Sequence, residues 1–283
     1  MKVMTIYAHP ADTITNCGGT LALHAKRGDE VVALILTHGG RLHPNKYAEE
    51  WRKENPDPAI VQAGLEDIAL NKRRELERAA EHIGISKLIL LDYDDNYSTV
   101  QEDIVNRIAE ELSKERPDVV ICDYPMNPAI HNPHTLATQM AFAALSKVSL
   151  YLRNLDGHEE FQVKQIFLTT LPVSPMDGLS LNGLRNDVFV DITPVVGEKV
   201  RAMDEFKSQG YSGLFARKLI ESFNGEYGRA AGVNYAEGFY RVYNETHDHL
   251  PLTEAAKRSD LLTRHLTYST MNLRAMYPVA EES

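Results

Sequence analysis

The chain has 283 residues, enough for one large α/β domain with an extension or for two small domains. Apolar residues make up 43% and charged residues 25%, a balance typical of globular proteins, and the net charge of −10 argues against a nucleic-acid partner or an anionic membrane surface. No apolar run approaches the ~20 residues of a membrane span, and the first residues enter a strand pattern without the features of a signal peptide, so we expect a cytoplasmic protein.

Strand-like and helix-like segments alternate along the first two thirds of the chain. Near-continuous apolar runs predict strands at Lys2–Tyr7, Glu30–Thr37, Lys87–Asp92, Asp118–Asp123, Gln165–Leu171 and Asp187–Ile192. Apolar residues at helical spacing predict helices at 14–27, Leu70–His82, 104–112, His134–Val148 and Val195–Gln209. Strands that are apolar on both faces are covered by helices on both sides, and repeated β-α-β units place them in parallel. The pattern therefore predicts an α/β fold with a doubly wound, mostly parallel sheet.

Two long irregular segments interrupt this alternation, at His38–Pro58 and Tyr124–Pro133. Loops of this length in a compact domain are usually functional. After Gly210 the chain shows no clear strand pattern. We therefore divide it into a catalytic domain at 1–210 and an extension at 211–283, built of helices and loops that pack on the edge of that domain.

Polar clusters follow the first and the fourth predicted strands. The first is His9-x-x-Asp12, and the second is the HNPH segment from His131 to His134. With the common strand order 3-2-1-4-5, both lie at the carboxyl edge of the sheet where the strand order reverses, which is where ligands bind. Either cluster alone is weak, because Asp12 also suits a helix N-cap. Together they offer the imidazole and carboxylate donors of a catalytic zinc site and predict a metal centre for a small-molecule substrate.

At these residues the chain resembles the LmbE-like, or PIG-L, deacetylase superfamily, whose motifs are A-H-P-D-D and H-x-x-H. The resemblance extends over roughly residues 1–245 and includes Gly18-Gly19, the T-H-G after the second strand, Lys72-Arg73-Arg74-Glu75 as an R-x-x-E-like helix, Asp95 after the third strand, Arg116-Pro-Asp-Val-Val, Lys199 to Ser208-Gln209, and Ala236-Glu237-Gly-Phe239. It implies a Rossmann-like fold with a zinc at the carboxyl edge of the sheet.

The resemblance implies specific roles by position. His9, Asp12 and His134 would be the metal ligands, although a site of this kind accommodates iron or cobalt as well as zinc. His131 would stabilise an oxyanion or move a proton beside the metal. Asp95 would orient a ligand or a histidine.

The basic stretch of the R-x-x-E-like helix has two interpretations. One of Lys72, Arg73 and Arg74 contacts the substrate, or the stretch is a solvated helix face paired with acidic neighbours. Superfamily members often form trimers or hexamers, so the resemblance also implies a homo-oligomer.

The chain departs from the family pattern at Ala11. The deacetylases use the first aspartate of H-P-D-D as the general base, and Ala11 stands at that position, followed two residues later by Thr13. HNPH replaces the usual HPDH, but both histidines are kept. Losing the carboxylate would slow amide hydrolysis ~10²–10⁴-fold unless another group replaces it.

Our favoured interpretation is a hydratase, because the chain resembles the 4-oxalomesaconate hydratase branch, in which this position is also alanine. Its substrate would be a multiply charged acid whose carboxylates are received by Arg41, Lys46 and the Lys72–Arg74 stretch. That branch implies a glutamate in the loop after the second strand and a histidine near Pro172. The aligned positions hold His43 and Val173, with Glu49 and Glu50 available in the same loop.

Two other interpretations remain open. The protein is an N-deacetylase acting on an amino sugar or a related amide, with His131, His43 or a loop glutamate such as Glu49 in place of the lost base. Alternatively, it binds a metal and a ligand without turnover.

Overall fold

The computed structural model describes residues 1–41, 54–126, 133–151, 161–169 and 185–254, together with the single residues 257 and 277. Its strands are β1 (Lys2–Tyr7), β2 (Glu30–Thr37), β3 (Lys87–Tyr93), β4 (Val119–Asp123), β5 (Gln165–Thr169), β6 (Val188–Asp191) and β7 (Ala236–Arg241). Its α-helices are α1 (Asp12–Lys26), α3 (Pro58–Val61), α4 (Leu65–Ile83), α5 (Glu102–Glu115), α6 (Pro133–Ser146), α8 (Val196–Asp204), α9 (Leu214–Leu219) and α10 (Gly225–Ala231). Shorter turns lie at η1 (Lys147–Tyr151), η3 (Thr193–Val195) and η4 (Ile220–Asn224).

The strands form one mixed sheet in the order β3-β2-β1-β4-β5-β7-β6. The first five pair in parallel, which confirms the predicted α/β class and the 3-2-1-4-5 order. β7 runs antiparallel to both β5 and β6. Parallel strands end at the same edge, so the first residues after β1, β2, β3 and β4 lie at that edge.

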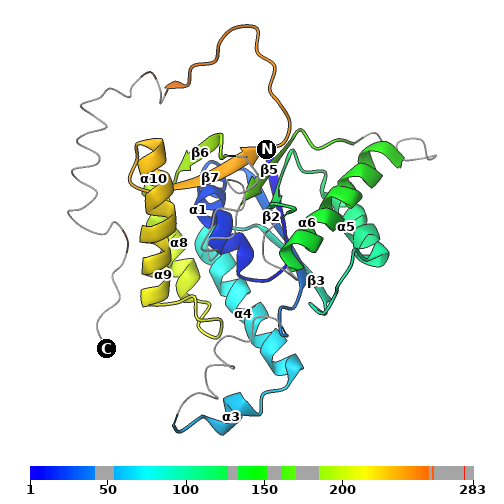
Figure 1. Cartoon of the computed structure of the whole chain (residues 1–283), viewed down its shortest axis with the longest axis vertical. Coiled ribbons are helices and arrows are strands. Elements are labelled where there is room, and N and C mark those ends of the chain that lie inside the picture. Colours follow the sequence, from blue (N-terminus) through cyan, green and yellow to red (C-terminus); the bar gives the residue numbers. More distant parts are fainter. Residues whose placement is uncertain are drawn as a thin grey trace.

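Helices cover both faces of the sheet (Figure 1). On one face, Leu76 of α4 and Val200 of α8 pack with Val3 of β1, and α1 belongs to the same layer. On the other face, Met140 of α6 packs with Met4 of β1, next to α5. The alternation of Val3 and Met4 between the two faces is the two-residue period of a strand buried on both sides. Within the described residues, no helix is long and apolar enough to cross a membrane.

The structure corrects one expectation about the segment after Gly210. No strand was predicted there, but β7 lies inside the sheet between β5 and β6. The prediction was wrong because Glu237 and Gly238 break the apolar run of this strand. Glu237 is buried beside Lys199 of α8, so the charge is compensated by a residue far away in the sequence.

Candidate metal centre

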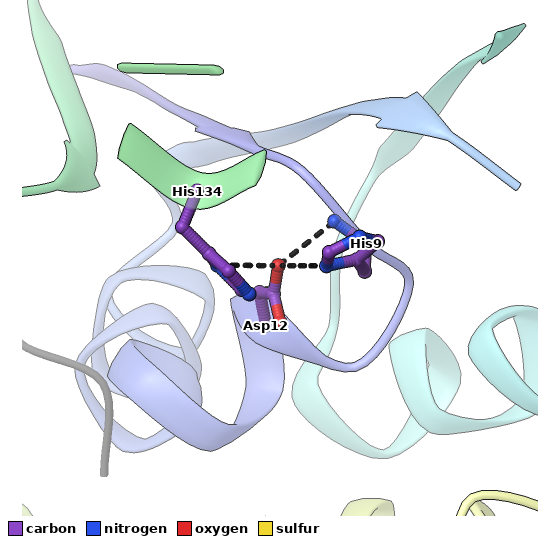
Figure 2. Close-up of side chains that lie close together, drawn as sticks. All are labelled: His9, Asp12 and His134. Atoms are coloured by element: carbon purple, nitrogen blue, oxygen red, sulfur yellow. Dashed lines mark hydrogen bonds and ion pairs between the residues drawn. The ribbon is translucent and has the colours of Figure 1, made fainter. Parts of the chain in front are cut away.

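The candidate site lies where the turn after β1 meets the start of α6. β1 and β4 are parallel neighbours, with Ile6 opposite Cys122, so the segments that follow them leave the same edge of the sheet. The structure brings His9, Asp12 and His134 together at this place, as Figure 2 shows.

The carboxylate of Asp12 lies between the two imidazole rings. Its Oδ2 atom is 3.5 Å from His9 Nδ1 and 3.3 Å from His134 Nδ1. The same oxygen accepts a 2.8 Å hydrogen bond from the backbone N–H of His9. Each of the three buried residues offers one ligand atom, and these atoms lie within 4.8 Å of one another. Two imidazoles and one carboxylate form a donor set that suits zinc, iron or cobalt.

Asp12 is not a helix cap here. α1 begins at Asp12, and Ala11 occupies the N-cap position. Ala11 is 3% exposed and belongs to the apolar core, so its methyl group is buried in the turn between His9 and Asp12.

The end of β2 packs against His9 through a glycine. Gly39, from the T-H-G motif, has a φ of 62°, in the left-handed region. A Cβ atom at this position would lie 3.3 Å from His9 Cδ2 and 3.2 Å from Pro10 Cδ. Glycine therefore permits both the backbone turn and the close approach to the imidazole ring.

Asp123, the last residue of β4, holds His134 in place. Its Oδ2 accepts a 2.9 Å hydrogen bond from His134 Nδ1. Its Oδ1 accepts hydrogen bonds from Asn16 Nδ2 at 2.8 Å and from Thr169 Oγ1 at 3.3 Å. With Nδ1 protonated, the lone pair of His134 that could bind a metal is on Nε2. Asp123 was not predicted as a site residue, although a carboxylate that ends the strand beside β1 was a usable signal.

The buried charges of the site compensate one another. Burial by itself lowers the pKa of His134, but Asp12 and Asp123 outweigh this effect and raise that pKa to about 9. Burial lowers the pKa of His9 despite the nearby Asp12. Burial favours the neutral form of Asp12, but the two histidines hold its pKa below the usual range. Near neutral pH, both ring nitrogens of His134 therefore carry a proton, and a metal ion would have to displace the one on Nε2.

Asp95 lies on the other side of His9. Its carboxylate is fully buried, with Oδ2 at 4.0 Å from His9 Nε2 and Oδ1 at 3.8 Å from His38 Nδ1. The backbone N–H of Arg41 donates to Oδ1 at 3.1 Å. Asp95 thus lies beside two histidines, and its role in orienting one of them remains a prediction.

His38, Asp94 and Asp95 also place their ligand atoms within 4.8 Å of one another. In this second group, His38 Nδ1 accepts a 3.0 Å hydrogen bond from the N–H of Gly40. The guanidinium of Arg41 pairs with Asp94 at 2.7 Å. The Arg41 side chain, which was predicted to contact substrate, therefore pairs with a surface carboxylate.

The basic stretch of α4 divides between the interior and the surface. Lys72 is fully buried, and its ammonium group donates to the carbonyl of Gly39. Burial lowers the pKa of Lys72 to about 8. Arg73 pairs with Asp92 at the surface, and Arg74 is exposed. Substrate contact remains a prediction for Lys72, whereas the two arginines fit the alternative of a solvated helix face.

Tyr97 fixes the start of α6. Its hydroxyl donates a 3.0 Å hydrogen bond to the carbonyl of Pro133, the residue before His134. Burial, together with the charges of Asp12 and Asp95, raises the pKa of Tyr97 well above its ordinary value, so the hydroxyl keeps its proton. The sequence pattern did not single out this residue.

Several predicted site residues lie outside the described part of the chain. They are His131, His43 and Glu49, together with Lys46, Glu50 and Val173. Their roles stay predictions.

Known proteins provide a comparison for this fold and site. Residues 4–145 match the family model of PIG-L, GlcNAc-PI de-N-acetylase. The chain is 26% identical over 247 residues to the diacetylchitobiose deacetylase of Thermococcus kodakarensis, covering 84% of this chain and 81% of the relative. It is 24% identical over 257 residues to the 4-oxalmesaconate hydratase of Pseudomonas putida, covering 88% and 92%. The crystal structure of the 4-carboxy-2-hydroxymuconate hydratase of Pseudomonas putida has the same fold, with a TM-score of 0.70 at 22% identity over 88% of this chain and 99% of that chain.

Proposed function

The chain belongs to the PIG-L family, and on that premise we propose that it is a metal-dependent hydratase that adds water to a carbon–carbon double bond of a small unsaturated acid. The observation that carries the proposal is Ala11. Its buried methyl group lies in the turn between His9 and Asp12. The family resemblance implies that the deacetylases carry a proton-moving carboxylate at this position. The relatives include both a hydratase and a deacetylase. The family resemblance implies that the residue at position 11 differs between these two reactions.

The residues present fit a divalent metal. His9, Asp12 and His134 are all buried and would hold it, and their ligand atoms already lie within 4.8 Å of one another. A metal bound there supplies Lewis-acid activation of water, lowering the pKa of the water to ~7. Asp123 accepts the Nδ1 proton of His134 and so fixes which ring nitrogen is available as a ligand.

The two reactions make different demands on the residue at position 11. Amide hydrolysis breaks a C–N bond, and the departing amine must receive a proton, which the missing carboxylate would deliver. Hydration forms one C–O bond and one C–H bond, and no group leaves. An alanine cannot move a proton, so the chain lacks at this position a group that amide hydrolysis requires. The proton transfers of hydration would be carried out by other groups.

Lys72 supports an acidic substrate. Burial lowers its pKa to about 8, although Asp95, Glu75 and Asp12 oppose this effect. The ammonium group is therefore mostly charged at pH 7, and its electrostatic influence reaches His9. A buried cation beside the ligands is suited to receive a substrate carboxylate, because charge-assisted hydrogen bonds are strongest away from water.

A second candidate function is zinc-dependent N-deacetylation of an amino sugar. The observation in its favour is the 26% identity to a diacetylchitobiose deacetylase over 84% of this chain. His131, His43 or Glu49 would then replace the base that Ala11 lacks.

Two assays run in parallel on the purified, metal-loaded protein separate these functions. We expect the ultraviolet absorbance of a conjugated enol tricarboxylic acid to fall with time, and we expect no acetate from N-acetylglucosamine or N,N'-diacetylchitobiose. The matched control is the His134→Ala protein, which should be inactive in both assays. Acetate release by the wild type but not by the control would refute the hydratase proposal.

A further inference from the structure

Helix α1 is interrupted just behind the candidate metal site. Cys17 has φ of −142° and ψ of 18°, which is not helical, so two helical pieces meet there. In an unbroken helix the N–H of Gly19 would donate to the carbonyl of Thr15, four residues earlier. At the interruption these two backbone groups have other partners, and both partners are charged side chains.

The ion pair of Lys199 and Glu237 occupies the interruption. Glu237, from β7, accepts the N–H of Gly19 at 2.9 Å and the N–H of Thr20 at 2.7 Å. Lys199, from α8, donates to the carbonyl of Thr15 at 2.9 Å and to Glu237 at 2.7 Å. The carboxylate thus caps the start of the second piece of α1, and the ammonium group caps the end of the first, each matching the local helix dipole.

Close packing keeps the second piece of α1 in place. A Cβ atom on Gly19 would lie 2.7 Å from Ile192 Cγ2, just before η3 and α8. The glycine therefore lets α1 approach the connection that leads into α8. Lys199 is 0% exposed and Glu237 is 1% exposed, so neither charge has access to water. A buried ion pair is weak evidence for stability by itself. This one also holds backbone groups of α1 through its hydrogen bonds.

The first piece of α1 carries two groups of the site. Asp12 is a candidate metal ligand, and Asn16 donates a 2.8 Å hydrogen bond to Asp123. Asp123 in turn accepts the Nδ1 proton of His134. The end of this piece is the Thr15 carbonyl that Lys199 binds. The orientation of this short piece therefore affects both Asp12 and the carboxylate that holds His134.

We propose that Lys199 and Glu237 are positioning residues for the metal centre, because their ion pair is inserted into the backbone hydrogen bonds of α1 and sets the orientation of its first turn. Neither residue contacts the candidate ligands directly. The inference rests on the proposed function, since it assumes that the site binds a metal.

The test is titration of chelator-treated protein with Co²⁺, following the visible absorption of the bound ion. The main variant is Lys199→Met with Glu237→Gln, which removes both charges together and leaves neither one uncompensated. We expect Co²⁺ affinity to fall by ~10–100-fold, the usual effect of losing groups that orient metal ligands, and the absorption spectrum to change. The spectrum reports ligand geometry in the folded protein, so a purely structural role would leave it unchanged.

The matched control is Glu115→Gln. Glu115 is also buried and accepts from two lysines, Lys2 and Lys87, but it lies near the amino-terminal ends of β1 and β3, at the opposite edge of the sheet. The Glu115→Gln substitution should lower the stability of the protein and leave both the Co²⁺ affinity and the absorption spectrum unchanged.

Each outcome has a distinct meaning. If the wild type binds Co²⁺ and the double variant binds it equally well with the same spectrum, the positioning inference is overturned and the proposed metal site stands. If the wild type binds no Co²⁺, the proposed function fails and the inference fails with it. If the double variant does not fold, the isosteric Glu237→Gln alone decides, because it keeps one acceptor oxygen for the two amides. Weaker binding with an altered spectrum supports the inference, and unchanged binding overturns it.

Discussion

Replacing Lys72 with methionine should stabilise the protein or leave its stability near that of the wild type, while weakening substrate binding. Lys72 is fully buried on α4, and its ammonium group donates to the Gly39 carbonyl. Burial lowers its pKa from 10.5 to about 8. Methionine has a similar length, carries no charge and fills the same space, so the substitution removes the charge with little change in packing.

The pKa of Lys72 gives the magnitude and the sign of the change in stability caused by Lys72→Met. The difference between 10.5 and about 8 means that the charged form is disfavoured by roughly 3 kcal/mol in the folded state. Below pH 8 the lysine is protonated in both states, and the folded protein carries this whole penalty. Between pH 8 and 10.5 the folded state loses its proton first, so wild-type stability rises with pH. The variant also leaves the Gly39 carbonyl without this donor, at a cost of about 1–3 kcal/mol, so its net gain at pH 7 is about 0–2 kcal/mol.

Urea unfolding of chelator-treated wild type and Lys72→Met at pH 7 and pH 10.5 measures the effect. The stability advantage of the variant should fall by roughly 2–3 kcal/mol between these two pH values, because only the wild type has this titrating group. Arg74→Met, an exposed neighbour on the same helix, should show no such change. For an acidic substrate, KM of the Lys72 variant should rise ~10–100-fold, the effect of losing a hydrogen bond from a charged donor. A stability difference that is the same at both pH values would refute the reasoning.

Three further predictions concern the metal centre. Ala11→Asp should abolish hydratase activity by placing a second carboxylate in the buried turn between His9 and Asp12, and a gain of acetate release from N-acetylglucosamine would instead identify a deacetylase that had lost its base. Asp123→Asn should weaken metal binding ~10–100-fold in an equilibrium titration, because the Nδ1 proton of His134 loses its charged acceptor; unchanged affinity would contradict the assigned role. Metal binding at pH 6 should release close to one proton from His134, whose pKa is raised to about 9, because metal-bound water with a pKa of ~7 keeps most of its protons at that pH. Calorimetry in buffers of different ionisation enthalpy measures the release, and a release close to zero at pH 6 would argue against it.

Local patterns were sufficient to predict most of the sheet. β1 to β5 are apolar on both faces and are linked by helices, so their parallel order follows from the rules for β-α-β units. β7 could not be predicted in this way. Its buried Glu237 has its compensating partner, Lys199, 38 residues earlier, and only the folded chain shows that the charge is paired.

The candidate ligands were predictable because two short motifs follow neighbouring strands, and the structure places them together. The sequence was also sufficient to predict that Lys72 is the buried residue of its basic stretch. Lys72, Leu76 and Ala79 share the helical spacing of the buried face of α4, whereas Arg73 and Arg74 do not. The burial of Glu75 was not predictable, because it depends on contacts with Ser208, which is distant in the sequence.

The most direct test of the metal centre is the metal content of the purified protein, measured by mass spectrometry for the wild type and for His134→Ala. The site residues His9, Asp12 and His134 predict close to one divalent ion per chain in the wild type and a large loss in the variant. Circular dichroism of both proteins confirms that the comparison is between folded chains. Metal that is undiminished in a folded His134→Ala protein would contradict the assignment of these three ligands.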